Sequence, residues 1–141
     1  MRVTLYGAAR TVTGSAYHVE TQTGSVLVDF GMVQGHDKEN HANAIPPTLD
    51  LDNLGAVLLT HAHLDHCGRL PLLIKAGWQG PIYATPATRE MASLILHDAA
   101  KVQAQDLERE NRRRMRAGEE PVGPLYTQDD VDATMALFRT V

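Results

Sequence analysis

Residues 54–66 of this chain read Leu-Gly-Ala-Val-Leu-Leu-Thr-His-Ala-His-Leu-Asp-His. The first six form an apolar run that is short enough for a strand, and we expect it to be buried on both faces, as in a sheet covered by helices. Four side chains of types that bind metal ions follow at the C-terminal end of the run: His61, His63, Asp65 and His66. The stretch therefore predicts a strand of an α/β fold that delivers a histidine-rich loop to one edge of the sheet.

The donors of this loop suit zinc, which binds imidazole nitrogen and carboxylate oxygen. His61 and His63 are two residues apart, so in an extended segment both point the same way and can bind one ion. Asp65 and His66 are adjacent and are expected to lie across a tight turn, where a second ion can bind. Two ions about 3.5 to 4 Å apart share a water, lower its pKa towards 7 and stabilise a phosphoryl displacement. The loop therefore predicts a hydrolytic site with two Zn²⁺ ions.

Other single residues of these types have simpler interpretations. Cys67 is either a soft extra ligand or a small buried core residue, and the second is favoured. The histidines outside the loop are interpreted one by one as surface residues, and these are His18, His36, His41 and His97.

Upstream of the loop the pattern predicts three strands, at residues 2–6, 15–20 and 25–30. Their connections are brief, so the strands are expected to form an antiparallel meander. Residues 7–14 are rich in small side chains, and they either line the mouth of the site or simply connect two strands. Residues 32–52 form a long irregular connection, which we interpret as functional because it directly follows Asp29.

Downstream of the loop the pattern alternates between helix and strand. A short helix at residues 70–74 is expected to stop at Gly77, and a strand follows at residues 81–84. Thr85 and Pro86 predict the start of a longer helix. The face of that helix expected to pack on the sheet carries Met91, Leu94, Ile95, Ala99 and Val102.

Beyond Val102 the long helix is expected to continue as a solvated extension to residue 117, supported by the i,i+4 pairs Glu108–Arg112 and Glu110–Arg114. Residues 118–124 break it. Thr127 then predicts the cap of a last helix, with no closing element after it. The apolar positions of that helix are Val131, Met135 and Phe138.

Composition restricts the function classes only loosely. The chain has 141 residues, the size of one domain, and a net charge of −4, which gives no whole-chain basic field for nucleic acid. Its single cysteine fits a reducing compartment. The N-terminus lacks the pattern of a signal peptide, and no stretch reaches the roughly 18 to 20 apolar residues of a membrane span. We therefore expect a soluble, cytoplasmic protein without a membrane partner.

Arginines gather at one place, on the predicted helical extension. One interpretation is contact with RNA phosphates, which is electrostatic and salt-sensitive. The other, which we favour, is a solvated helix face neutralised by the glutamates around it. The arginines are Arg109, Arg112, Arg113, Arg114 and Arg116.

The histidine-rich loop after a hydrophobic strand resembles the second motif of the metallo-β-lactamase superfamily, and Val28-Asp29-Phe30-Gly31 is similar to its first motif. Further stretches narrow the resemblance to the β-CASP ribonucleases, relatives of the mRNA 3′-end cleavage endonuclease. These stretches are Gly7 with Thr13-Gly14-Ser15, the Gln34-Gly35 turn, and residues 83–88, 111–114 and 124–127.

This resemblance implies an αββα sandwich, with a mixed sheet and flanking helices, and a zinc-dependent phosphodiesterase that cuts RNA. By motif position, His61 and His63 would bind one zinc, and Asp65 and His66 the other. Asp65 would also handle the proton of the attacking water, and Asp29 would hold the loop through hydrogen bonds without binding metal. The expected partners are an RNA substrate, contacted by Arg112, Arg113 and Arg114, and a second copy of the full-length protein in a homodimer.

The chain departs from the family pattern in one respect. The family uses a further histidine and aspartate from later strands and an inserted β-CASP domain, whereas only His97 lies downstream of the loop here. Residues 1–141 are therefore expected to be the N-terminal part of a metallo-β-lactamase-like domain in a longer enzyme. Since catalytic zinc sites use three protein ligands, we expect weak metal binding and little activity from this part alone.

Two other functions stay open. A small-molecule hydrolase of the same superfamily, acting on thioesters or lactones, is disfavoured by the arginine-rich stretch. A non-catalytic RNA-processing subunit is disfavoured because the set of loop ligands is intact.

Overall fold

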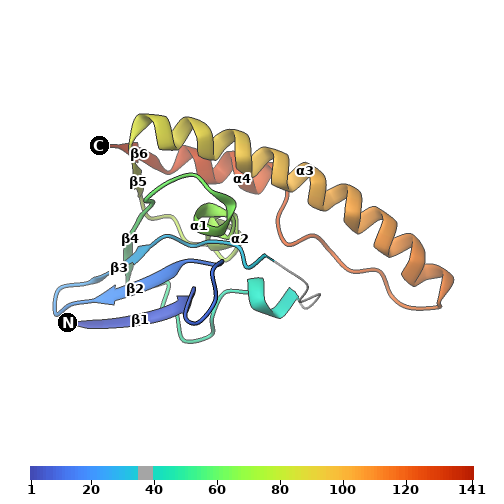
Figure 1. Ribbon diagram of the computed structural model, residues 1–141, viewed down its shortest axis with the longest axis horizontal. Coiled ribbons are helices and arrows are strands. Elements are labelled where there is room, and N and C mark those ends of the chain that lie inside the picture. The colour runs from blue at the N-terminus through green and yellow to red at the C-terminus, as the bar shows by residue number, and fades with distance from the viewer. Residues whose placement is uncertain (35–39) are drawn as a thin grey trace.

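The computed structural model describes residues 1–34 and 40–141, and side chains outside residues 35–41. A six-stranded mixed sheet has its helices on one face (Figure 1). The fold confirms the predicted α/β architecture of a mixed sheet with flanking helices. The Gln34-Gly35 turn and His36 fall on residues outside the described ones, as does the side chain of His41.

The first three strands form the predicted antiparallel meander. They are β1 (Arg2–Gly7), β2 (Ala16–Glu20) and β3 (Ser25–Val28). The third strand ends two residues earlier than predicted, because Asp29 has a φ of 58°. This left-handed conformation turns the chain out of the sheet and is uncommon for a residue other than glycine, although aspartate adopts it more readily than most.

The remaining strands run parallel and follow the order of the sequence. They are β4 (Leu54–Leu58), β5 (Ile82–Ala84) and β6 (Phe138–Thr140), and β4 pairs with β3. The prediction that Phe138 belongs to a last helix and that nothing follows it was wrong. Three residues are too few to show an alternating pattern, so this strand is recognised only by its pairing with β5.

The helices begin and end close to their predicted signals. They are α1 (Leu64–Cys67), α2 (Leu70–Lys75), α3 (Pro86–Arg116), α4 (Gln128–Ala136) and a 3₁₀ turn, η1 (Asn40–Asn43). The Thr85 hydroxyl accepts the Thr88 N–H, and Thr127 forms a capping box with Asp130. No helix in the described part of the chain is long and apolar enough to cross a bilayer.

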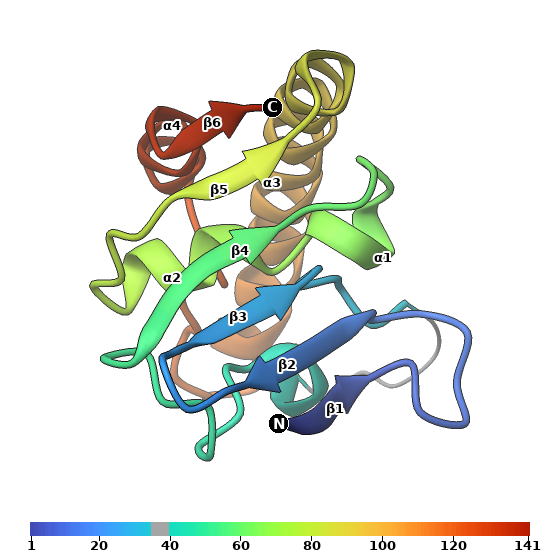
Figure 2. The same cartoon turned by 90° about the vertical axis from the view of Figure 1, so that its left-hand side faces the viewer.

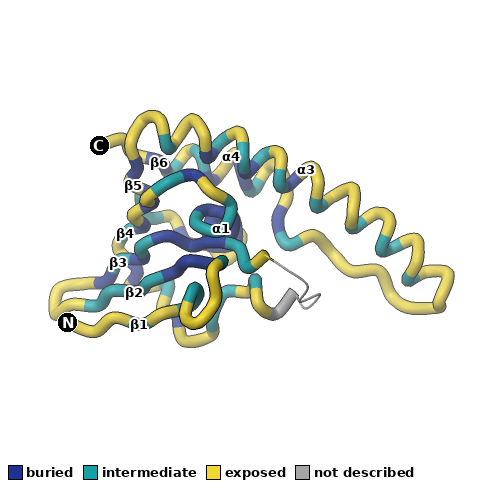
Figure 3. Tube along the Cα trace, in the orientation of Figure 1, coloured by how far each residue is buried: buried dark blue, intermediate teal, exposed yellow. Residues whose placement is uncertain are grey.

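The buried face of α3 differs from the predicted one. Ala92, Leu96 and Ala100 are buried, whereas Leu94 is 67% exposed and Met91 51%. Two alanines on the inner face allow α3 to approach the rest of the domain closely. Of the predicted face, Met91, Leu94 and Val102 are exposed, whereas Ile95 is partly buried against the core. Figure 3 shows how buried and exposed positions alternate along α3.

Strand β4 is buried on one face only, so the expectation of burial on both faces was wrong. Val57 and Ile82 are fully buried beneath the helices, whereas Leu58 is 39% exposed and Tyr83 36%. Figure 2 views the sheet from this open side, and no described element covers it. The continuous apolar run of β4 is consistent with a second layer on that face.

His18 was interpreted as a surface residue, and that interpretation was wrong, because its side chain is buried. It lies on the same face of β2 as Ala16, and its ring stacks on Tyr6 with centroids 6.0 Å apart. A single polar residue in a short strand carries no sequence signal for the face that it occupies.

His97 bridges α3 and α4. Its Nδ1 contacts the Ser93 carbonyl at 2.7 Å and its Nε2 contacts Asp132 at 2.9 Å. Only the imidazolium donates from both nitrogens, and these two contacts, that with Ser93 first, raise the pKa of His97 above its usual 6.5.

A pH-dependent stability follows from this raised pKa. Because the folded state binds the proton more tightly than the unfolded state, the stabilisation is fully present below pH 6.5 and is lost as the pH rises through the raised pKa. We expect the Tm difference between wild type and His97→Gln to be larger at pH 5.5 than at pH 8.5, and Asp132→Asn to reduce this dependence. Equal differences at both pH values would contradict the prediction.

Candidate metal centre

The histidine-rich loop lies at the edge of the sheet where the parallel strands have their carboxyl ends. Figure 2 shows that the β1–β2 loop and the connections that leave β3 and β4 all lie at this edge. Backbone hydrogen bonds join them; for example, the Ser15 N–H donates to the Asp65 carbonyl at 2.8 Å, and the Phe30 N–H donates to the His66 carbonyl at 2.8 Å. Three segments that are distant in the sequence therefore meet around the loop.

Asp29 is the centre of the hydrogen bonds at this edge. Its carboxylate is 3% exposed and accepts from the Ser15 hydroxyl at 3.2 Å and from the Thr60 N–H at 2.9 Å. It also lies 2.9 and 3.0 Å from the Thr60 hydroxyl and 2.7 Å from His66 Nδ1. A buried carboxylate is costly unless it is hydrogen-bonded in this way.

These contacts select the tautomers of two histidines. Because Asp29 is acceptor-only when ionised, His66 must carry its proton on Nδ1 to donate to it. The Thr60 hydroxyl gives its one proton to Asp29, so it accepts at 3.0 Å from Nδ1 of His61. In the neutral form of each ring these contacts leave Nε2 without a proton, the form that binds a metal.

The donor atoms of the loop come together in pairs. His61 Nε2 lies 3.2 Å from His63 Nδ1, and His66 Nε2 lies 3.6 Å from Asp65 Oδ2. Two ligands about 2.0 to 2.2 Å from one tetrahedral zinc are roughly 3.3 to 3.6 Å apart, so each pair is spaced to share an ion. Among the described residues no group of three or more such side chains is arranged so that it could hold one metal ion. The donor chemistry therefore fits zinc, and each pair is one ligand short of a usual catalytic site.

Gly31 permits the close approach of the β3 connection to the loop. A Cβ built on Gly31 would lie 1.6 Å from the Asp65 carbonyl oxygen and 2.6 Å from the His66 nitrogen. No side chain fits there, so this position requires glycine for steric reasons.

Comparison with known families decides the classification. The family described as "Metallo-beta-lactamase superfamily" matches residues 9–137. The chain belongs to the metallo-β-lactamase superfamily. This confirms the resemblance carried by the histidine-rich loop and by Asp29.

Relatives within the superfamily have RNA-related names. Ribonuclease TTHA0252 of Thermus thermophilus is 51% identical over 102 residues, which are 72% of this chain and 23% of the relative. Transcription termination factor FttA of Methanosarcina mazei is 37% identical over 107 residues, 75% of this chain and 17% of the relative. These relatives confirm the β-CASP ribonuclease-like branch, and the chain spans less than a quarter of their length.

Solved structures of the superfamily show a weaker likeness. A metallo-β-lactamase of Cronobacter sakazakii is 22% identical with a TM-score of 0.45, covering 62% of this chain and 32% of that one. The short form of human tRNase Z is 23% identical with a TM-score of 0.42, covering 69% and 40%. The classification therefore rests on the family match and not on these scores.

Three residues around the histidine-rich loop were not predicted to belong to the site. Thr60 and Ser15 contact Asp29 directly, and the buried Arg69 donates to the Gly14 and Gly31 carbonyls. Of these three residues, Thr60 is the one whose role could have been predicted from the sequence, because a hydroxyl directly before the first histidine can reach both the loop and the aspartate.

Cys67 lies beside the loop but within the core. It is fully buried, its thiol donates to the Ala62 carbonyl at 3.4 Å, and burial raises its pKa to about 12. Since a metal ligand must be a thiolate, these observations favour the core interpretation.

The arginine cluster lies on an arm formed by the C-terminal half of α3 and the segment that returns from it (Figure 1). Arg112 pairs with Glu108 at 3.4 Å, as predicted, but Glu110 pairs with Arg113 at 2.9 Å and not with Arg114. Arg114 instead donates to the Glu120 carbonyl and pairs with Glu119. The return segment draws Arg114 away from Glu110, a contact that helix periodicity does not predict.

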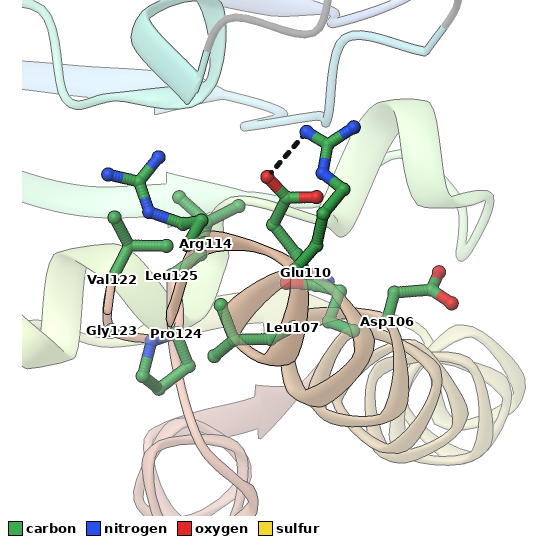
Figure 4. Close-up of a pocket in the computed structure, with 10 residues that line it drawn as sticks. Asp106, Leu107, Glu110, Arg114, Val122, Gly123, Pro124 and Leu125 are labelled. Carbon is green, nitrogen blue, oxygen red and sulfur yellow. Dashed lines mark hydrogen bonds and ion pairs between the residues drawn. The ribbon is translucent and has the colours of Figure 1, made fainter. Parts of the chain in front are cut away.

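A pocket lies on the arm between α3 and the return segment. Leu107 from α3 faces Val122, Pro124 and Leu125 (Figure 4), and the paired Glu110 and Arg113 also line the pocket. Four of the five arginines, namely Arg109, Arg112, Arg113 and Arg114, pair with acidic side chains, which favours the interpretation of a neutralised helix face over one of RNA contact.

Proposed function

We propose that this chain carries the first metal-ligand loop of a metal-dependent RNA phosphodiesterase, with residues 1–141 as the N-terminal part of its metallo-β-lactamase-like domain. The observation that carries the proposal is the network of Asp29. One buried carboxylate contacts His66 directly and His61 through Thr60, and in the neutral form of each ring these contacts leave Nε2 without a proton. Hydrogen bonds that fix the tautomers of ligating histidines in this way are typical of metal sites.

RNA as the substrate is supported by the relatives. One is named a ribonuclease and others are named transcription termination factors. We propose a phosphodiester of RNA as the bond that is cut. A small-molecule substrate has no comparable support, since neither of these names indicates one.

We propose zinc as the metal, with His61 and His63 holding one ion and Asp65 and His66 the other. Bound ions of this kind lower the pKa of water and stabilise charge on phosphate oxygens. Further ligands must come from outside these two pairs, since each supplies only two donors. We infer that they come from a later part of a longer enzyme.

The residues of the chain have separate roles in this proposal. Asp65, which is half-buried beside His66, accepts the proton of the attacking water. Asp29 is shielded from the substrate by its burial and acts by orienting the histidines.

The direct test uses the full-length gene product with zinc. We expect it to cut single-stranded RNA and to leave thioesters intact, and Asp65→Ala to lower the rate of RNA cleavage by about 100-fold or more, the usual range for losing a proton-transfer group. Asp52→Ala, at an exposed loop carboxylate, is the matched control and should retain the wild-type rate. Thioester hydrolysis without RNA cleavage would refute the proposed substrate, and an unchanged rate in Asp65→Ala would refute the role of Asp65.

Thr60 offers a test of the ordering network without loss of a metal ligand. Thr60→Val removes the hydroxyl that joins Asp29 to His61 and keeps the shape of the side chain, whereas Thr60→Ser keeps the hydroxyl. We expect zinc affinity, measured by competition with a chromophoric chelator, to fall roughly 10-fold in Thr60→Val and to stay near wild type in Thr60→Ser. Equal affinities in both variants would show that the hydroxyl does not order His61.

A further inference from the structure

Arg69 is a buried arginine directly behind the histidine-rich loop. It follows Gly68, forms the N-cap of α2 and is 1% exposed. Its guanidinium carbon lies 4.3 Å from the centroid of the Phe30 ring, and burial lowers its pKa to about 10, so it remains charged at neutral pH. A buried charge is unfavourable unless hydrogen bonds compensate it, so the partners of Arg69 indicate its role.

The three guanidinium nitrogens donate to backbone carbonyls of three different segments. Nε donates to Gly31 after β3, Nη2 to Gly14 of the β1–β2 loop at 3.4 Å, and Nη1 to Ala44 after η1 at 3.4 Å. The planar fork of arginine spans such a set of acceptors, whereas lysine presents all its donors from one point.

Two of these carbonyls lie beside the residues that hold Asp29. Gly14 precedes Ser15, whose hydroxyl donates to Asp29 at 3.2 Å. Gly31 lies two residues after Asp29, and its N–H donates to the Ser15 carbonyl at 2.8 Å. Arg69 therefore joins the two segments that meet at the contact between Ser15 and Asp29.

We propose that Arg69 is a positioning residue for Asp29: its guanidinium fixes the Gly14 and Gly31 segments so that the Asp29 carboxylate meets Thr60 and His66. This inference rests on the proposed function, in which Asp29 orders the metal ligands. The backbone of Arg69 also contacts the segment that carries Asp29, because its N–H donates to the Phe30 carbonyl at 2.8 Å.

The test compares Arg69→Lys, which keeps the charge, with Leu73→Ala, which opens a cavity at a fully buried position of the same helix. In metal-free full-length protein, hydrogen exchange of the His66 Nδ1–H, read by NMR, reports its contact with Asp29. We expect Arg69→Lys to speed this exchange and to weaken zinc binding by about 10- to 100-fold. Leu73→Ala should lower the Tm and leave both other readouts unchanged. If Arg69→Lys also lowers only the Tm, Arg69 has a general structural role and the proposal is overturned.

Ser15→Ala provides a second measurement in case Arg69→Lys does not fold. It removes the hydroxyl contact with Asp29 and leaves Arg69 in place. We expect the Arg69 Nε–H to exchange faster in Ser15→Ala than in wild type, and an unchanged rate would overturn the coupling. If the wild-type protein binds no zinc, the proposed function is refuted. The exchange rates in metal-free protein would still decide the role of Arg69.

Discussion

Replacing Asp29 by asparagine is expected to weaken zinc binding by roughly 10- to 100-fold, the usual effect of losing a residue that orients metal ligands. Asparagine has nearly the same size and tolerates the φ of 58° at this position. Its amide group, however, offers a donor where the carboxylate accepts from Thr60 and His66. One of these partners loses its acceptor, so at least one histidine is free to adopt the other tautomer.

Zinc affinity of the full-length protein, measured by competition titration, checks this prediction. Asp50→Asn is the matched control, because Asp50 is an exposed carboxylate that also accepts backbone and side-chain hydrogen bonds, from Asp52 and Asn53. We expect the control to bind zinc as wild type does. If Asp29→Asn also retains wild-type affinity, the carboxylate does not order the ligands, and the main support for the proposed function is lost.

Replacing Gly31 by alanine should have the largest effect on stability. The added Cβ would lie 1.6 Å from the Asp65 carbonyl oxygen and 2.0 Å from its carbon, and both are backbone atoms. No rotamer change relieves such a clash, so the connection after β3 must move away from the loop. We expect a loss of about 4 kcal/mol or more in the free energy of unfolding, in the range that marks a severe structural conflict.

Urea denaturation of the variant and the wild type measures this loss. Gly123→Ala is the control, since a Cβ at Gly123 meets no heavy atom within 4 Å, and it should change stability by less than about 0.5 kcal/mol. A similarly small change in Gly31→Ala would mean that the two segments separate at little cost. The close contact between Gly31 and Asp65 would then not be needed for the fold.

Much of the fold follows from local sequence signals. The brief connections between the strand patterns at residues 2–6, 15–20 and 25–30 predicted the antiparallel strands, and Thr85 and Thr127 marked the starts of α3 and α4. These features depend on backbone hydrogen bonds and conformational preferences within a few residues, so they can be inferred before any tertiary contact is known.

Predictions that needed knowledge of packing were less successful. Met91 and Leu94 have the spacing of a core face, yet α3 buries Ala92, Leu96 and Ala100. Periodicity identifies apolar stripes but cannot decide which of two stripes meets the sheet, because that depends on how closely the helix can approach. The same limit applies to Phe138, whose strand exists only through pairing with β5.

The histidine-rich loop shows both what local sequence predicts and what only tertiary packing decides. The sequence by itself predicted the donor set His61, His63, Asp65 and His66, since residue type and spacing along six positions are local properties. Only the tertiary structure decided that Asp29 contacts His66 and Thr60 and that Gly31 packs on the Asp65 carbonyl. It also decided that Arg69 holds these segments together. These contacts join residues 31 to 55 positions apart in the chain, and a pairing over such a separation arises from the packing of the whole sheet edge.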